Sequence, residues 1–142
     1  MATYNKFNDF VNELAKGKHV FGTDAFKLML TNSAPVATNT IKSDITDISA
    51  GNGYTAGGAS VTVTESVSTG TVTTQGTQVV ITAAGGTIGP FRYAVLYNDT
   101  QSSPVKPLVA WWDYGSSITL NDGESLTATF NSSNPGNIFT LT

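Results

Sequence analysis

The sequence predicts an all-β protein, namely a jelly-roll β-sandwich of about eight strands with one short N-terminal α-helix. Charged residues make up only 12% of the 142-residue chain, about half the usual share, while Thr, Val and Gly are abundant. Thr and Val suit pleated strands, and Gly suits turns. After Gly22, short runs with a period of two recur at close intervals, which is typical of sandwiches. The length fits one domain, predicted as residues 19–142, preceded by a helix or arm at residues 1–18.

The N-terminal segment is the only stretch with a helical period. We predict a helix over residues 3–16, with Thr3 as its cap and Gly17 as its stop. Its apolar side chains either pack on the chain's own domain or dock on a neighbouring subunit. One face of this helix carries side chains that are three or four residues apart, Tyr4, Phe7, Val11 and Leu14, and Phe10 broadens that face.

Short strands account for most of the remaining chain. The runs at 70–74 and 78–83 are predicted to pair with each other. The turn Asn121-Asp122-Gly123 is a strong hairpin signal and predicts that its two flanking strands pair. The predicted strands cover residues 24–31, 59–65, 70–74, 78–83, 91–98, 107–113, 117–120, 124–130 and 137–141.

A long polar segment, residues 32–58, interrupts the strands. Loops of this length in a compact domain are usually functional or form interfaces. Its Gly51-Asn-Gly-Tyr-Thr-Ala56 run satisfies a permissive dinucleotide-binding pattern, but a Thr/Val strand follows it where a helix is required. We therefore expect a turn whose glycines adopt positive φ, anchored by the ring of Tyr54.

Residues 91–117 hold six of the fourteen aromatic side chains. Trp111 and Trp112 are adjacent in a predicted strand, so they point to opposite faces. One is then core, and the other is exposed together with Tyr114. Exposed rings favour a protein interface, with a sugar-stacking platform as the alternative. Arg92 is expected to pair with Asp113 if their strands are neighbours.

The sequence offers little reactive chemistry. There is no cysteine, and His19, the single histidine, is expected at the surface or as a helix cap. Carboxylate pairs such as Asp44 and Asp47 lack an EF-hand pattern. Glu65 and Glu124 are strand-associated, but nothing in the sequence brings them together as a glycosidase pair. We expect no enzyme activity, no catalytic residues, no cofactor and no metal.

Charge and hydropathy exclude two further partner classes. Residues 1–42 hold five lysines against three carboxylates, giving +2, and the remainder holds two cations against seven carboxylates, giving −5. Neither half is basic enough for nucleic acid. No run approaches the ~20 apolar residues of a membrane span, and no signal peptide is apparent. We therefore expect no nucleic-acid or membrane partner, and synthesis in the cytoplasm.

Four segments together resemble a known family. They are TYNKFNDFVNELAKGKHVFGTDAFKLMLTNSAP, AGNGYTAGG, GGTIGPFRYAVLYND and PLVAWWDYGSSITLNDGE. They are similar to small structural proteins of tailed bacteriophages, and most closely to capsid cement or decoration proteins. The resemblance spans nearly the whole chain.

The resemblance implies a jelly-roll module on the outside of the phage head, made in the host cytoplasm. It implies binding to the major capsid protein, bridging of capsid subunits, and a homodimer or homotrimer. The alternative is a tail-associated receptor-binding or carbohydrate-binding β-sandwich module. The family supplies no contact residues that map onto this chain, so the interface candidates come from the reading of the residues: Tyr4, Phe7, Phe10, Val11, Tyr54, Trp111 and Tyr114.

Overall fold

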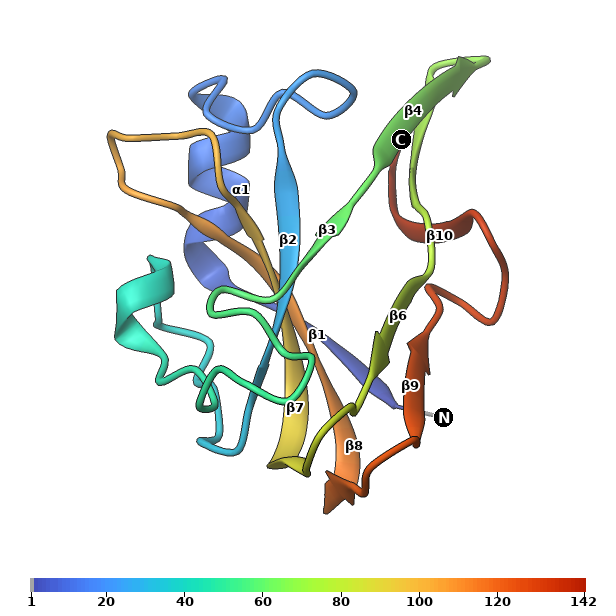
Figure 1. The fold of residues 1–142 in the computed structure, drawn as a ribbon. Coiled ribbons are helices and arrows are strands. Elements are labelled where there is room, and N and C mark those ends of the chain that lie inside the picture. Colours follow the sequence, from blue (N-terminus) through green and yellow to red (C-terminus); the bar gives the residue numbers. More distant parts are fainter. Residues whose placement is uncertain (1) are drawn as a thin grey trace.

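Two layers of antiparallel strands face each other in the computed structural model, which describes residues 2–142 (Figure 1). The predicted all-β class is confirmed. The first layer is a five-stranded sheet in the order β1-β8-β7-β2-β3. Its strands are β1 (Thr3–Lys6), β8 (Leu108–Leu120), β7 (Ile88–Asn98), β2 (Phe26–Thr31) and β3 (Ala59–Val61).

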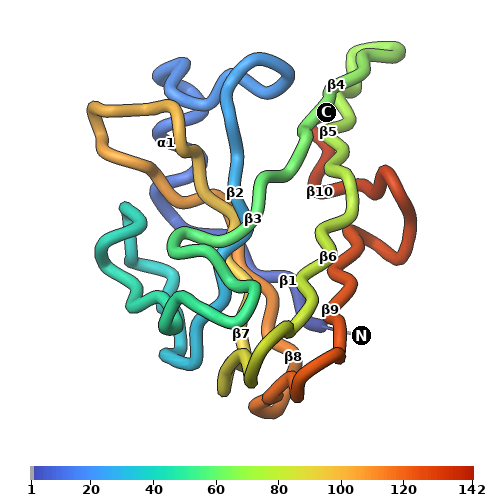
Figure 2. Tube along the Cα trace, viewed as in Figure 1, coloured from blue at the N-terminus to red at the C-terminus, as the bar shows by residue number. Residues whose placement is uncertain are grey.

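The second layer consists of two small sheets. One is three-stranded in the order β10-β5-β4, and the other pairs β6 with β9. Figure 2 shows β3 running on into β4 as the chain passes from the first layer to the second. The strands are β10 (Gly136–Leu141), β5 (Thr71–Gly76), β4 (Val63–Ser68), β6 (Val79–Thr82) and β9 (Ser125–Ala128).

The five-stranded sheet is buried on both faces, which explains why β2 reads as a nearly continuous apolar run. Phe26, Leu28 and Leu30 point into an inner core between the layers. Met29 points the other way, into an outer core that also contains Tyr97. The sheet is therefore a central platform with a separate core on each side.

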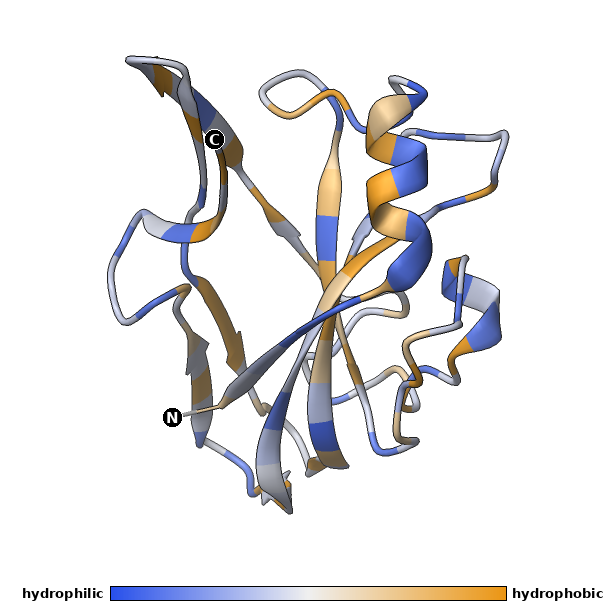
Figure 3. Ribbon diagram, turned by 180° about the vertical axis from the view of Figure 1, so that it is seen from behind, coloured by the Kyte–Doolittle hydropathy of each residue, from blue (hydrophilic) through white to orange (hydrophobic). Residues whose placement is uncertain are grey.

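The outer core is covered by segments without strand structure. Helix α1 (Asn8–Ala15) lies beside one end of the sheet (Figure 3), where its cap Phe7 packs in the outer core, whereas its Phe10 and Leu14 pack against the inner core. The segment 32–48 covers the remainder, and its 3-10 turn (Lys42–Asp44) is followed by the buried Ile45. The backbone amide of Asn8 donates to the carbonyl of Ala37 at 2.9 Å, which joins the two coverings.

The predicted helix over residues 3–16 is wrong in its first half. Residues 3–6 form β1, an edge strand on which Tyr4 lies opposite Trp112. The backbone N–H and C=O groups of residues 3–6 pair with the edge of β8 and not with each other in a helical turn. The sequence of residues 3–6 gives no indication that this distant strand edge is available. Thr3 is consequently not the helix cap; Phe7 is, without a side-chain hydrogen bond.

The end of the helix follows the prediction. Gly17 adopts φ +72°, and the amide of Lys18 donates to the carbonyl of Glu13 at 2.9 Å. This is a Schellman motif, in which glycine takes the left-handed position without a Cβ clash.

Two predicted pairings are wrong. Residues 70–74 and 78–83 do not pair with each other, because β5 pairs with β4 and β10 whereas β6 pairs with β9. The turn at residues 121–123 does not close a hairpin either, because β9 leaves β8 and joins the opposite layer. The segments 107–113 and 117–120, predicted as two strands, form one long strand, β8. A turn signal specifies a local chain reversal, whereas the free edge of β6 selects the partner of β9.

Candidate interaction surfaces

The seven interface candidates fall into two groups. Four fill the chain's own cores and are at most 9% exposed: Phe7, Phe10, Tyr54 and Trp111. Three are at the surface, where Tyr4 is 41%, Val11 49% and Tyr114 59% exposed. The helix buries Phe10 and Glu13, and Val11 lies on its exposed side, about 100° around the helix axis from Phe10.

The adjacent tryptophans point to opposite faces, as predicted. Trp111 packs in the outer core against Phe7, with ring centroids 4.5 Å apart. Trp112 is the partly exposed ring and lies between the two layers. The sequence reasoning chose Trp111 as the interface candidate and missed Trp112. The packing on each face of β8 decides which of the two is exposed, because the outer core encloses Trp111 whereas the groove leaves Trp112 partly open.

A bulge in β8 places Tyr114 at the surface. Phe91 lies opposite Ile118, whereas Tyr93 lies opposite Asp113, so residues 114–117 have no partner on β7. Gly115 has φ +99° within the bulge, and its amide donates to Asp113 Oδ1 at 2.8 Å. A bulge re-aims the side chains that it contains.

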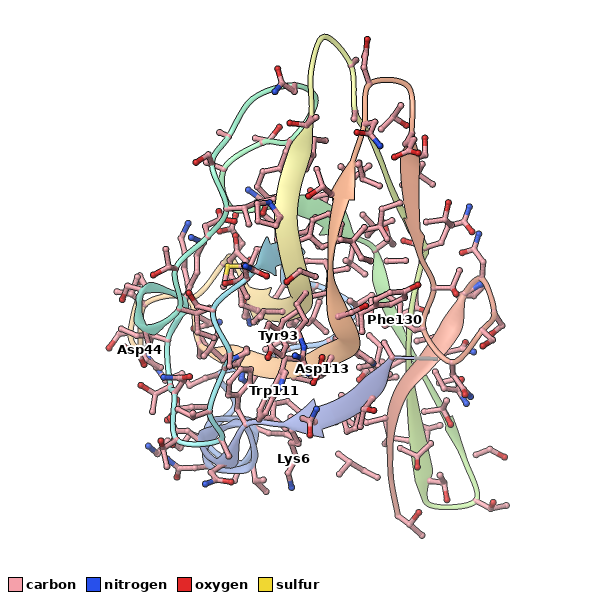
Figure 4. The ribbon with its side chains drawn as sticks, turned by 90° about the horizontal axis from the view of Figure 1, so that it is seen from below. Lys6, Asp44, Tyr93, Trp111, Asp113 and Phe130 are labelled. Atoms are coloured by element: carbon pink, nitrogen blue, oxygen red, sulfur yellow. The ribbon has the colours of Figure 1, made fainter. Side chains whose placement is uncertain are left out.

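The predicted Arg92–Asp113 pair is confirmed. Arg92 donates from Nε to Oδ1 at 2.8 Å and from Nη2 to Oδ2 at 2.9 Å. These hydrogen bonds hold the pKa of Asp113 below its ordinary value. Figure 4 shows Asp113 beside Tyr93 and Trp111, with Phe130 across the space between the layers. The pair thus organises one rim of that space.

A groove of about 600 Å³ opens between the layers on this side. Three rings cross it in a row: Tyr4 on β1, Trp112 on β8 and Phe130 after β9. Their centroids are 5.6 Å and 5.3 Å apart in edge-to-face contacts. The part of the lining that comes from the second layer includes residues with uncharged hydrogen-bonding side chains, such as Thr129 and Asn137.

The groove carries little charge. Arg92 is the only charged residue that lines it, and Asp113 neutralises Arg92 through two hydrogen bonds. An uncharged groove with an aromatic floor favours an uncharged occupant, since burial of an unpaired charge is costly.

The sheet β10-β5-β4 projects beyond the rest of the molecule (Figure 1). Val67, Val72 and Leu141 lie in register across its three strands, so they share one face. Val67 is 70% and Leu141 44% exposed. The opposite face carries hydroxyl side chains, such as those of Ser66 and Thr73. This element has an apolar row that no other part of the described chain covers.

The segment 32–58 is held rigidly at its base. Tyr54 donates from its hydroxyl to Asp47 Oδ1 at 2.5 Å and accepts a hydrogen bond from the amide of Leu30 at 2.9 Å. Asp47 Oδ2 also accepts from the amide of Gly57 at 2.5 Å, and Tyr97 donates to the carbonyl of Gly57 at 2.7 Å. Burial raises the pKa of Tyr54, so its hydroxyl stays protonated and donates.

The glycines of this segment adopt the predicted positive φ. Gly58 has φ +85°, and a Cβ there would lie 2.0 Å from the carbonyl oxygen of Leu28. Only glycine permits such a close approach of two backbones. The Gly51–Gly58 region therefore forms an anchored turn, as expected from the sequence.

His19 is buried, contrary to the expectation of a surface or capping histidine. It is 4% exposed and packs among the rings of Phe10, Phe21 and Phe26. Its Nδ1 lies 3.4 Å from the side-chain nitrogen of Asn98. Burial lowers the pKa of His19 to about 4, so the ring is neutral at pH 7.

Within residues 2–142 no group of three or more His, Asp or Glu side chains is arranged to hold a metal ion. No helix of that part of the chain is long and apolar enough to cross a membrane. Comparison with known proteins found no matching family model, no matching curated protein and no matching solved structure.

Proposed function

We propose that this protein is a virion structural protein, a capsid decoration protein that binds the outside of a tailed-phage head and bridges major capsid subunits. The similarity of four of its segments to phage decoration proteins supports this proposal. The jelly-roll connectivity that the similarity implies is part of the proposal, and the two facing layers of antiparallel strands support it.

The observation that carries the proposal is the anchored segment 32–58. It is long, its residues 32–48 lie over the outer core, and hydrogen bonds through Tyr54, Asp47 and Tyr97 fix its base. A loop that is already ordered loses little conformational entropy on binding, which strengthens a contact of given area. Val36, 54% exposed, presents an aliphatic side chain from this segment.

The mechanism follows from mass action. A protein that binds the assembled shell and not its dissociated subunits stabilises the shell in proportion to occupancy. Many copies on one particle multiply a modest free energy per site. A low charge content and the absence of cysteine suit a particle that persists outside cells.

Binding to heads tests the proposal through surface substitutions. Removal of residues 1–18 is unsuitable, because Phe7 and Phe10 belong to the cores. Purified protein is added to expanded phage heads that lack it, and occupancy is measured by cryo-EM and sedimentation. Val36→Glu should weaken binding at least ~10-fold, since a carboxylate would be desolvated at the contact.

Val20→Glu serves as the matched control. Val20 is 45% exposed and lies in the loop before β2, where its backbone hydrogen bonds are to Thr23 and Asp24 and not to the segment 32–58. It should bind like the wild type. Wild-type protein that does not bind any head refutes the decoration role, and equal binding by both variants refutes the contact through segment 32–58.

A receptor-binding or carbohydrate-binding tail module is the second candidate. The groove with its row Tyr4, Trp112 and Phe130 favours it, because aromatic rings stack on the apolar faces of sugars. Binding of the isolated protein to host-surface glycans, together with no affinity for heads, would establish this function instead.

A further inference from the structure

We propose that the groove of one copy receives the β4–β5 hairpin of a second copy, so that the chains associate head to tail. This contact is independent of the decoration role, because it joins copies of this chain and involves no capsid subunit. It would cover two surfaces that the described residues 2–142 leave exposed, namely the groove of one copy and the projecting hairpin of another.

The groove exposes a strand edge as well as side chains. Residues 126–132 line it consecutively, and so do residues 137–140. Successive side chains on a strand point to opposite faces, so one face alone cannot present consecutive residues. Among the described residues β9 pairs only with β6, and β10 only with β5. The groove therefore borders the unpaired edges of both strands, whose backbone groups an extended segment would satisfy.

The hairpin offers such a segment. β4 is the other outer strand of its sheet, and its register against β5 has no bulge. Residues 63–76 contain no proline and no lysine, which usually protect an edge from pairing. The projecting end carries Val67 and Val72 on one face and hydroxyl groups on the other.

The low charge of both surfaces favours this occupant. Glu65 is the only charged residue in the hairpin, residues 63–76, and the groove has no net charge. The aliphatic face of Val67 and Val72 matches the floor of aromatic rings, while Thr and Asn side chains opposite match the hydroxyl face. A sugar would stack on the aromatic rings but would not pair with the unpaired backbone groups along β9 and β10.

The sheet order makes the contact intermolecular. β4 and β10 are opposite edges of one sheet, with β5 between them, so they cannot pair within a chain. Pairing β4 of one copy with the β10 edge of the next creates a heterologous interface, which closes into a ring or extends as a filament. A closed ring of two or three copies would agree with the homodimer or homotrimer that the resemblance implies.

Sedimentation equilibrium over a wide range of protein concentrations tests the contact. Val67→Glu disables the hairpin, and Thr129→Glu disables the groove. Both positions are exposed, so folding should persist, and circular dichroism checks it. Each variant alone should raise the dissociation constant at least ~10-fold, and Val36→Glu should not change it.

Mixing the two variants gives the decisive result. Val67→Glu keeps an intact groove and Thr129→Glu keeps an intact hairpin, so an equimolar mixture should form a dimer and nothing larger. Failure of the mixture to dimerise overturns the head-to-tail contact. A wild-type chain that stays monomeric at millimolar concentration overturns it as well. So does binding of chitohexaose to the monomer with a change in tryptophan fluorescence that Trp112→Ala abolishes.

Discussion

His19 shows how one buried side chain couples the fold to pH. Its ring occupies a pocket of phenylalanines, and Asn98 is its nearest polar neighbour. The carboxylates of Glu13, Asp24 and Asp9 favour the charged ring, but burial outweighs them and lowers the pKa to about 4. The unfolded chain restores the ordinary pKa of 6.5.

This difference predicts acid destabilisation between pH 6.5 and pH 4. In that range the unfolded chain binds a proton that the folded chain does not, so the free energy of unfolding falls as the pH falls. A difference of this size corresponds to about 3 kcal/mol at pH 4. Urea denaturation at pH 7 and pH 4.5 measures the loss.

His19→Gln is the matched variant, because it keeps a polar partner for Asn98 and does not titrate. Its free energy of unfolding should change less over the same range, even if it is lower at pH 7. An equal loss in the variant and the wild type would assign the acid sensitivity to carboxylates such as Asp24 instead.

At the scale of elements, β1 is the segment whose role differs most from its predicted one. It contributes four register pairs to β8 and lays Tyr4 on the edge of Trp112. Its removal would leave the β8 edge unpaired and widen the groove.

Deletion of residues 2–6 should lower the free energy of unfolding by about 2 kcal/mol, since each cross-strand pair contributes a few tenths to 1 kcal/mol. Tryptophan emission should shift to longer wavelength as Trp112 meets water. Helical circular dichroism should remain, because α1 starts at Asn8. A large loss of helical signal with unchanged tryptophan emission would show instead that these residues form part of a helix.

On the scale of the whole molecule, stability is distributed unequally between the layers. The five-stranded sheet has a core on each face, whereas the projecting end of β4 and β5 is covered on neither. Local opening is easiest where few apolar contacts hold the chain.

Hydrogen exchange should follow this layering. Amides at the centre of β7, around Val95 and Leu96, should exchange at least ~100-fold more slowly than those at the hairpin end around Ser68. The hairpin amides should gain protection as protein concentration rises, because association covers them. Uniform protection across both layers at low concentration would contradict the unequal distribution.

Much of the local structure was predictable. Gly17, the turn around Tyr54 and the opposite faces of Trp111 and Trp112 follow from backbone geometry within a few residues. The pair Arg92–Asp113 was predictable on the condition that β7 and β8 are neighbours, which they are. Partner choice was not predictable, and both wrong pairings concern strands whose edges suit more than one neighbour.

The candidate interaction surfaces were likewise only partly predictable from the sequence. The sequence identified the aromatic segment and the long loop, and its interface candidates include Tyr4, Val11 and Tyr114, which are exposed. It also named Phe7, Phe10, Tyr54 and Trp111, which are buried, because apolar side chains have the same pattern in a core and at an interface. It missed Trp112 and Phe130, which meet only after the two layers form.

The sequence by itself determined that this chain is built of short strands and turns, because side-chain periodicity and glycine conformations act over a few residues. Only the tertiary structure decided which strand edges are satisfied and which stay open along β4, β9 and β10. The physical reason is that backbone hydrogen bonds in a sheet join residues distant in sequence, and any extended edge satisfies them equally well until packing selects one.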